Sequence, residues 1–224
     1  MADTGSRSAS TVAAGADRSA SRREKLIRSA YRVIVARGLQ RVSIEDVAEE
    51  AGVSRGLIGY HFGNKDNLLL ETMRWAFLEM ERRIRSTAGE GAAADRLVAL
   101  LDVLFVAPER NREFFLFYLE LTEHAARLRS FEPFVPMVRS IVNRYYEEII
   151  EQGMTEGAFD VTDVTRAAIS MRAVIEGTFL QWLQEEDRRS SHAGYRAACE
   201  RDLLRVLGAE GRAAGAQAGP PSGR

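Results

Sequence analysis

The sequence predicts an all-α fold, and three observations support this prediction. Apolar residues recur every three or four positions along most of the chain, strand-like alternation of apolar and polar residues is missing, and glycine or proline separates the periodic segments. With 224 residues, of which 46% are hydrophobic and 28% charged, the chain can build one large domain or two modest ones. We expect about nine helices. The chain is expected to consist of a disordered tail at 1–20, a first domain at 21–66, a second domain at 67–208 and a disordered tail at 209–224.

The first domain is expected to hold three helices. The periodic stretch at 22–37 predicts the first of them. Ser43 is followed three residues later by Asp46, a capping pattern that predicts the start of a short second helix. Gly52 supplies a tight turn, and Ser54 is a suitable N-cap for a short third helix. Two short helices joined by such a turn form a helix-turn-helix, whose second helix enters the major groove of DNA.

The second domain is expected to consist of longer helices. A small, glycine-bearing stretch at 87–95 is the expected joint between the two groups of helices. Apolar periodicity predicts the third helix of the first domain at about 55–62. It predicts the helices that follow at about 64–85, 92–106, 110–129, 133–152, 162–187 and 191–208.

The charges are unevenly distributed along the chain. From Arg18 through Lys65, ten Lys and Arg stand against five Asp and Glu, a local +5, which leaves 21 minus 27, or −6, elsewhere. This split predicts contact with a polyanion in the first quarter of the chain, although solvated helix faces also produce such imbalances.

The short helices concentrate groups that suit DNA. Gly56 and Gly59 lie three residues apart on the third helix, so they share a face that can approach either DNA or a neighbouring helix. Hydroxyls at helix starts can bind phosphate, and an arginine at the start of the third helix can pair with guanine or with the backbone. The expected DNA-binding residues are Arg22, Arg23, Ser43, Ile44, Ser54, Arg55, Gly56, Leu57, Gly59, Tyr60, His61 and Lys65.

The stretch "SIEDVAEEAGVSRGLIGYHFGNKDNLL" resembles the DNA-binding signature of the TetR (tetracycline-repressor) family, and the resemblance covers about residues 22–70. It implies a homodimeric transcriptional regulator, usually a repressor, that releases a near-palindromic operator when a small molecule enters its C-terminal domain. "GLIGYHF", "KDNLL" and "RAVIEGTFLQWL" are also similar to the subgroup with the choline and betaine pathway repressor. One position departs from the pattern: many members carry a phosphate-binding tyrosine where this chain has Gly59.

Aromatic and sulfur-bearing side chains in the second half predict a largely apolar pocket for an unknown small-molecule effector, or alternatively a solid core. The expected pocket residues are Phe105, Phe117, Tyr118, Leu121, His124, Phe134, Met137, Asn143, Met171 and Glu176. Apolar residues at alternating spacings of four and three predict a seam for a homodimeric four-helix bundle, or a face turned to the protein's own core. The expected seam is Val164, Ala168, Met171, Ile175, Thr178, Trp182, Tyr195, Cys199, Leu203 and Leu207.

Other functional classes find little support in the sequence. Its three histidines, His61, His124 and His192, are far apart, and no zinc-protease motif, nucleophile elbow or phosphate-binding loop is present. We therefore expect neither catalysis nor a metal or cofactor. The single cysteine, Cys199, fits a reducing compartment, and no apolar run is long enough for a membrane span, so a cytoplasmic location is expected. The alternative function is that of a dimeric architectural DNA-binding protein without an inducer.

Overall fold

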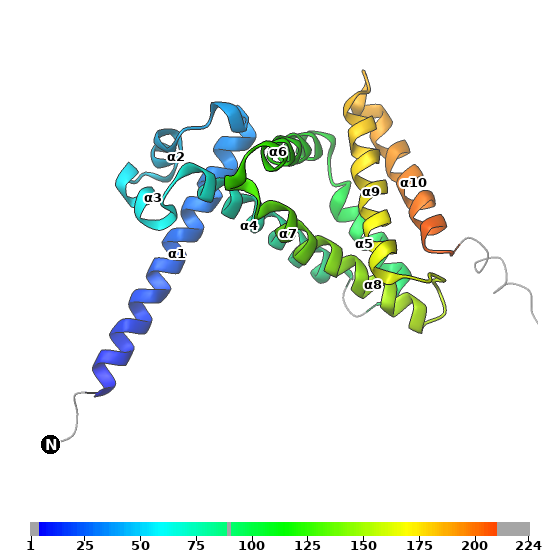
Figure 1. Ribbon diagram of the computed structural model, residues 1–224, viewed down its shortest axis with the longest axis horizontal. Helices are drawn as coiled ribbons and strands as arrows, with labels where there is room; N and C mark the ends of the chain where they lie inside the picture. Colours follow the sequence, from blue (N-terminus) through cyan, green and yellow to red (C-terminus); the bar gives the residue numbers. More distant parts are fainter. Residues whose placement is uncertain (1–4, 89–90, 210–224) are drawn as a thin grey trace, which may run out of the picture. The chain divides into compact units, whose positions relative to one another are not determined.

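The computed structural model describes residues 5–88 and 91–209, and all regular elements in these ranges are helical, as the sequence predicts (Figure 1). The elements are α1 (Gly5–Arg37), η1 (Leu39–Arg41), α2 (Ile44–Ala51), α3 (Arg55–Phe62), α4 (Lys65–Ala88), α5 (Ala93–Leu104), α6 (Pro108–Arg127), η2 (Arg129–Phe131), α7 (Phe134–Val138), η3 (Arg139–Asn143), α8 (Arg144–Thr155), α9 (Val164–Leu183) and α10 (Arg188–Val206).

The N-terminal region differs from its expected disorder, because α1 already begins at Gly5. Elongation adds one hydrogen bond for each residue fixed, so a helix that has nucleated extends readily through alanine-rich sequence. The tail expected at 1–20 is therefore helical from Gly5 onward. Residues 1–4, and the tail expected at 209–224 apart from Ala209, lie outside the described residues.

The helix expected at 133–152 appears as α7, η3 and α8 without an interruption, and η3 is a π-helical turn. The buried side chains of this stretch include a set with a spacing of four. An α-helix has 3.6 residues per turn, so a spacing of four rotates such a stripe steadily around the axis. The wider π turn removes part of that rotation and keeps the stripe facing the core. These residues are Phe134, Val138, Val142, Tyr146 and Ile150.

The chain divides into two compact units, with divisions inside α4, α6 and α7. One unit takes the residues up to Ala76 together with Phe117–Phe134, and the other takes Phe77–Leu116 and the residues from Val135 onward. The segment Phe117–Phe134 thus belongs to the same unit as the helix-turn-helix, although many residues separate the two in the sequence. The limits expected at 66 and 67 stay a prediction.

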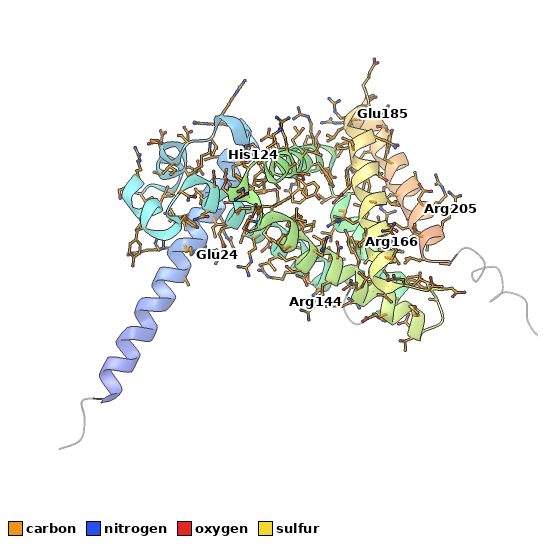
Figure 2. The ribbon with its side chains drawn as sticks, in the orientation of Figure 1. Glu24, His124, Arg144, Arg166, Glu185 and Arg205 are labelled. Carbon is orange, nitrogen blue, oxygen red and sulfur yellow. The ribbon has the colours of Figure 1, made fainter. Side chains whose placement is uncertain are left out.

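Each unit has its own apolar core. In the first unit, α1, α2 and α3 bury Leu26, Ile34, Val47 and Ile58. In the second, α9 packs along both α8 and α10, and Figure 1 shows α9 and α10 side by side. Figure 2 labels Glu185 at the connection between these two helices, where its carboxylate accepts a 2.6 Å hydrogen bond from the Tyr195 hydroxyl.

Candidate DNA-binding surface and effector domain

The start of α2 is fixed by the capping box that the sequence predicts. The Asp46 backbone N–H donates to the Ser43 hydroxyl over 3.1 Å, and the Ser43 backbone N–H donates to the Asp46 carboxylate over 2.8 Å. The Ser43 hydroxyl also donates to Asp46, and with an ion pair to Arg37 these contacts hold the pKa of the Asp46 carboxyl below its ordinary value. The Ser43 hydroxyl thus donates its proton to Asp46, and its main role in this structure is to stabilise the start of α2.

The turn between α2 and α3 requires a glycine. Gly52 adopts φ 66° and ψ 42°, the left-handed conformation that side chains disfavour. The next N–H, that of Val53, donates to the Ala48 carbonyl over 3.0 Å and closes the end of α2. The turn and the capping box therefore define both ends of α2.

Helix α3 has a buried face and an open face. Ile58 and Phe62 are 0% and 5% exposed and hold the helix in the domain, whereas the Tyr60 side chain is 83% exposed. Among the described residues, a Cβ added at Gly59 would meet no atom within 4 Å, and one added at Gly56 would meet only the Ser54 hydroxyl, at 4.0 Å. Close packing within the described chain thus does not explain these glycines.

The open face carries the expected polar groups. Arg55 begins α3 with a 73% exposed side chain, and its Nη1 lies 2.7 Å from the Glu45 carboxylate of α2. The Tyr60 and His61 rings meet edge to face with centroids 5.2 Å apart. Ser54 is exposed and its side chain makes no capping hydrogen bond, and half-buried Lys65 begins α4 nearby.

Three other expected DNA contacts are partly enclosed by the protein itself. The Arg23 guanidinium lies 5.0 Å above the Phe62 ring and 3.2 Å from the Glu71 carboxylate, so it ties α1 to α3 and α4. Ile44 and Leu57 are half-buried, whereas Arg22 is exposed. The sequence could not separate Arg22 from Arg23, because neighbouring positions on a helix differ only in the direction they face.

Glu120 is a residue of this unit that sequence reasoning missed. Its carboxylate accepts a hydrogen bond of 2.8 Å from the Leu39 backbone N–H in η1, the segment that leads into α2. One turn further, His124 Nδ1 lies 2.7 Å from the Glu120 carbonyl, and Figure 2 shows His124 in the last turn of α6. The partners stand 81 positions apart, so no local sequence signal could have revealed the contact.

The expected effector residues are divided between the two units. Phe117, Tyr118, Leu121, His124 and Phe134 belong to the first unit, and Phe105, Met137, Asn143, Met171 and Glu176 belong to the second. Within the second unit, part of the aromatic set is a solid core, because the Phe179 ring stacks on Phe115 and Phe105 with centroids 3.9 and 4.3 Å away.

Buried polar groups interrupt the core of the second unit. The Asn143 Oδ1 oxygen is buried and has no hydrogen-bond partner among the described residues. His192 Nε2 lies 2.9 Å from Asn111 Oδ1, and burial lowers the pKa of this imidazole. Buried polar atoms without a partner are uncommon in folded proteins, and a bound molecule can satisfy them.

Most of the seam expected on α9 and α10 faces the chain's own core, and the contact of these two helices with a second copy stays a prediction. Cys199 is one of the buried residues of this seam, and burial raises the pKa of its thiol to about 11. Val164, Thr178 and Tyr195 are half-buried, and the other seven residues are buried within the single chain: Ala168, Met171, Ile175, Trp182, Cys199, Leu203 and Leu207. Periodicity identifies an apolar face but not which helix covers it, and here the chain's own helices do.

The opposite face of α9 is open and includes two small residues, Ala173 and Gly177. Ala173 is exposed, Leu180 is 46% exposed, and a Cβ added at Gly177 would meet no atom of the described chain within 4 Å. At 3.6 residues per turn these three positions share one side, roughly opposite Met171 and Trp182.

Two features are absent from the part of the chain that the structure describes. No helix there is long and apolar enough to cross a membrane. No group of three or more His, Cys, Asp or Glu side chains in that part of the chain could hold a metal ion.

The two halves of the chain match two family models. Residues 26–72 match the model of bacterial regulatory proteins of the tetR family, and residues 93–208 match the model of the C-terminal domain of BetI-type transcriptional repressors. The second match alone spans 116 of the 224 residues, which is more than half of the chain.

Curated relatives of this chain are transcriptional regulators, a class of protein that is not enzymatic. The HTH-type transcriptional regulator BetI of Brucella suis biovar 1 is 36% identical over 105 residues, which cover 46% of this chain and 53% of that protein. The HTH-type transcriptional repressor KstR2 of Mycolicibacterium smegmatis is 26% identical over 144 residues, 62% of this chain and 68% of that protein. The chain thus spans about half the length of the BetI proteins it matches.

Solved structures share the fold. A TetR-family transcriptional regulator from Rhodococcus sp. is similar with a TM-score of 0.72 and 25% identity, over 83% of this chain and 98% of that one. A transcriptional regulator from Saccharomonospora viridis, solved in complex with choline, is similar with a TM-score of 0.67 and 24% identity, over 82% of this chain and 95% of that one. Together with the helix-turn-helix geometry and the two matched models, these similarities show that the chain belongs to the TetR family of bacterial regulatory proteins and carries a BetI-type C-terminal domain.

Proposed function

We propose that this chain is a DNA-binding transcriptional regulator, a repressor that releases a palindromic operator when a small molecule binds its C-terminal domain. One observation carries the proposal. Helix α3 is anchored by buried Ile58 and Phe62, and it presents an open face with Arg55, two glycines that no packing contact requires, and exposed Tyr60. Such a face suits the major groove, where the first residues of a recognition helix meet base edges.

The DNA-bound form is proposed to be a homodimer, because a palindromic operator matches a protein with a two-fold axis. The proposed location of this regulator is the cytoplasm. The open side of α9 with Ala173, Gly177 and Leu180 supports a helix contact between two copies, because small residues let helices approach closely. On α9 this surface lies opposite the buried residues of the seam first expected from periodicity.

The effector is proposed to be a small, largely apolar molecule held in the C-terminal domain. Buried Asn143 supports one hydrogen-bond donor on this molecule, because the Asn143 side-chain oxygen accepts no hydrogen bond from the described residues. The similarity to a regulator solved with choline makes choline the first compound to test. The alternative function, an architectural DNA-binding protein without an inducer, predicts DNA binding that no metabolite in a broad panel changes.

The decisive experiment selects bound sequences from a randomised duplex library with the full-length protein. A single palindromic motif should be enriched, and its affinity should fall steeply with salt as phosphate contacts release counterions. Recovery of random sequence, or an affinity that salt does not change, would refute the proposal.

The Arg55→Ala variant assigns the role of the exposed arginine. It should lose affinity for the enriched motif by roughly 5- to 100-fold, and far less for random duplex, because a bidentate guanine contact discriminates by about 1–3 kcal/mol. Equal losses of affinity on the two duplexes would indicate that Arg55 contacts a phosphate and not a base.

A further inference from the structure

The DNA-facing surface contains an acidic side chain that the proposed function leaves unexplained. Glu45 lies in the first turn of α2, and its carboxylate is 2.7 Å from Nη1 of Arg55 in the first turn of α3. The two side chains are 58% and 73% exposed. A carboxylate at this place repels phosphate, so its presence beside a DNA-binding arginine calls for a physical reason.

Helix stabilisation does not account for the contact with α3. A carboxylate in the first turn stabilises a helix through its dipole, typically by a few tenths to 1 kcal/mol. Asp46 already supplies a carboxylate there and closes the capping box with Ser43. An exposed ion pair by itself also adds little stability, about 0–1 kcal/mol.

We propose that Glu45 is a positioning residue for base recognition that acts through Arg55, an inference that rests on the proposed DNA-binding function. Arginine has five N–H donors, and a bidentate contact with guanine O6 and N7 uses two of them. One contact with Glu45 therefore leaves enough donors for the base. The carboxylate holds the guanidinium beside the first turn of α2 and opposes its movement toward a phosphate.

This arrangement separates affinity from specificity. A free arginine gains affinity for any duplex by pairing with phosphate, and phosphate contacts carry no sequence information. Glu45 therefore lowers affinity for random DNA and raises the preference for a guanine at one position of the operator. Its removal should make the protein a stronger but less selective DNA binder.

The test is a double-mutant cycle on the full-length protein, with Glu45→Ala, Arg55→Ala and the double variant. Each is titrated with the duplex that the wild type enriches from a random library, with the same duplex substituted at the Arg55-dependent position, and with random duplex. Glu45→Ala should reduce the preference for the guanine-bearing duplex by about two- to fivefold, the range that an exposed ion pair can supply. The double variant should lose no more than Arg55→Ala alone, because the glutamate acts only through the arginine.

Two additional variants separate positioning from charge. Glu45→Asp keeps the carboxylate and should restore part of the preference. Glu49→Ala removes an equal charge from the exposed part of the same helix, so it corrects for the general gain in affinity on losing a negative charge. Unfolding temperatures of all variants establish that they fold.

Each alternative result overturns a defined part of the reasoning. An unchanged preference in Glu45→Ala would show a solvated surface pair, and a further loss in the Arg55→Ala background would show that Glu45 reads a base itself. Either result refutes positioning while the DNA-binding function stands. A wild type that enriches no sequence refutes the proposed function and the inference together.

Discussion

The contact between Glu120 and Leu39 gives a prediction whose size follows from the structure. The carboxylate accepts a half-buried backbone N–H over 2.8 Å at the entrance to α2, and Glu120→Ala leaves that N–H without its acceptor. Hydrogen bonds to charged groups contribute about 1.5–3 kcal/mol when buried, so for this half-buried group we expect a loss of about 1–2 kcal/mol. In a chain of this length each kcal/mol lowers Tm by about 2–4 °C, which gives a decrease of roughly 2–8 °C.

The measurement is thermal unfolding by circular dichroism at fixed protein concentration, with DNA titration alongside. Glu120→Gln keeps an oxygen acceptor but loses its charge, so it should show a smaller decrease. Glu123→Ala is the matched control on the same helix, since Glu123 pairs only over one turn, with exposed Arg127. That variant should stay within about 0.5 kcal/mol of the wild type.

DNA affinity should weaken in Glu120→Ala and remain unchanged in Glu123→Ala, because Leu39 leads directly into the helix-turn-helix. Equal unfolding temperatures for these two variants would refute a stabilising role of the hydrogen bond. A normal DNA affinity despite a lowered Tm would restrict that role to stability.

Two further variants test packing and assembly. Gly153→Ala should destabilise the protein by about 1–3 kcal/mol, because the new Cβ would lie 2.0 Å from a carbon of the Phe159 ring, which is 3% exposed. Gly59→Ala is the control, since its new Cβ meets no atom of the described chain within 4 Å, and equal Tm values for the two variants would contradict this packing. Leu180→Glu should yield a monomer by light scattering at micromolar concentration, whereas Val98→Glu, at a similarly exposed position of α5, should remain dimeric; a dimeric Leu180→Glu would exclude the open face of α9 as the interface.

Local chemistry explains why the helix-turn-helix could be predicted from the sequence. Ser43, Asp46 and Gly52 act within a few residues of themselves, through a capping box and a left-handed turn, and the structure confirms both features. The end of α3 follows from Gly63, which adopts φ 76°, whereas Ser54 begins this helix without a capping hydrogen bond from its side chain. The extended α1 was not foreseen, because its polar composition resembles a tail although its residues can prolong a nucleated helix.

Contacts between distant segments could not be predicted in this way. The periodicity of α9 identified an apolar face with Met171 and Trp182, but either the chain's own core or a second copy of the chain can cover such a face. The structure buries that face in the single chain and leaves the side with Gly177 open.

Local sequence patterns were enough to predict the all-α fold, the ends of the short helices and the DNA-binding motif, since each depends on neighbours within about one helical turn. Only the tertiary structure decided that Arg23 packs on Phe62, that Arg55 meets Glu45 and that Glu120 supports Leu39. The physical reason is that a helix pattern specifies which residues share a face, whereas the partner of that face is set by how the whole chain folds.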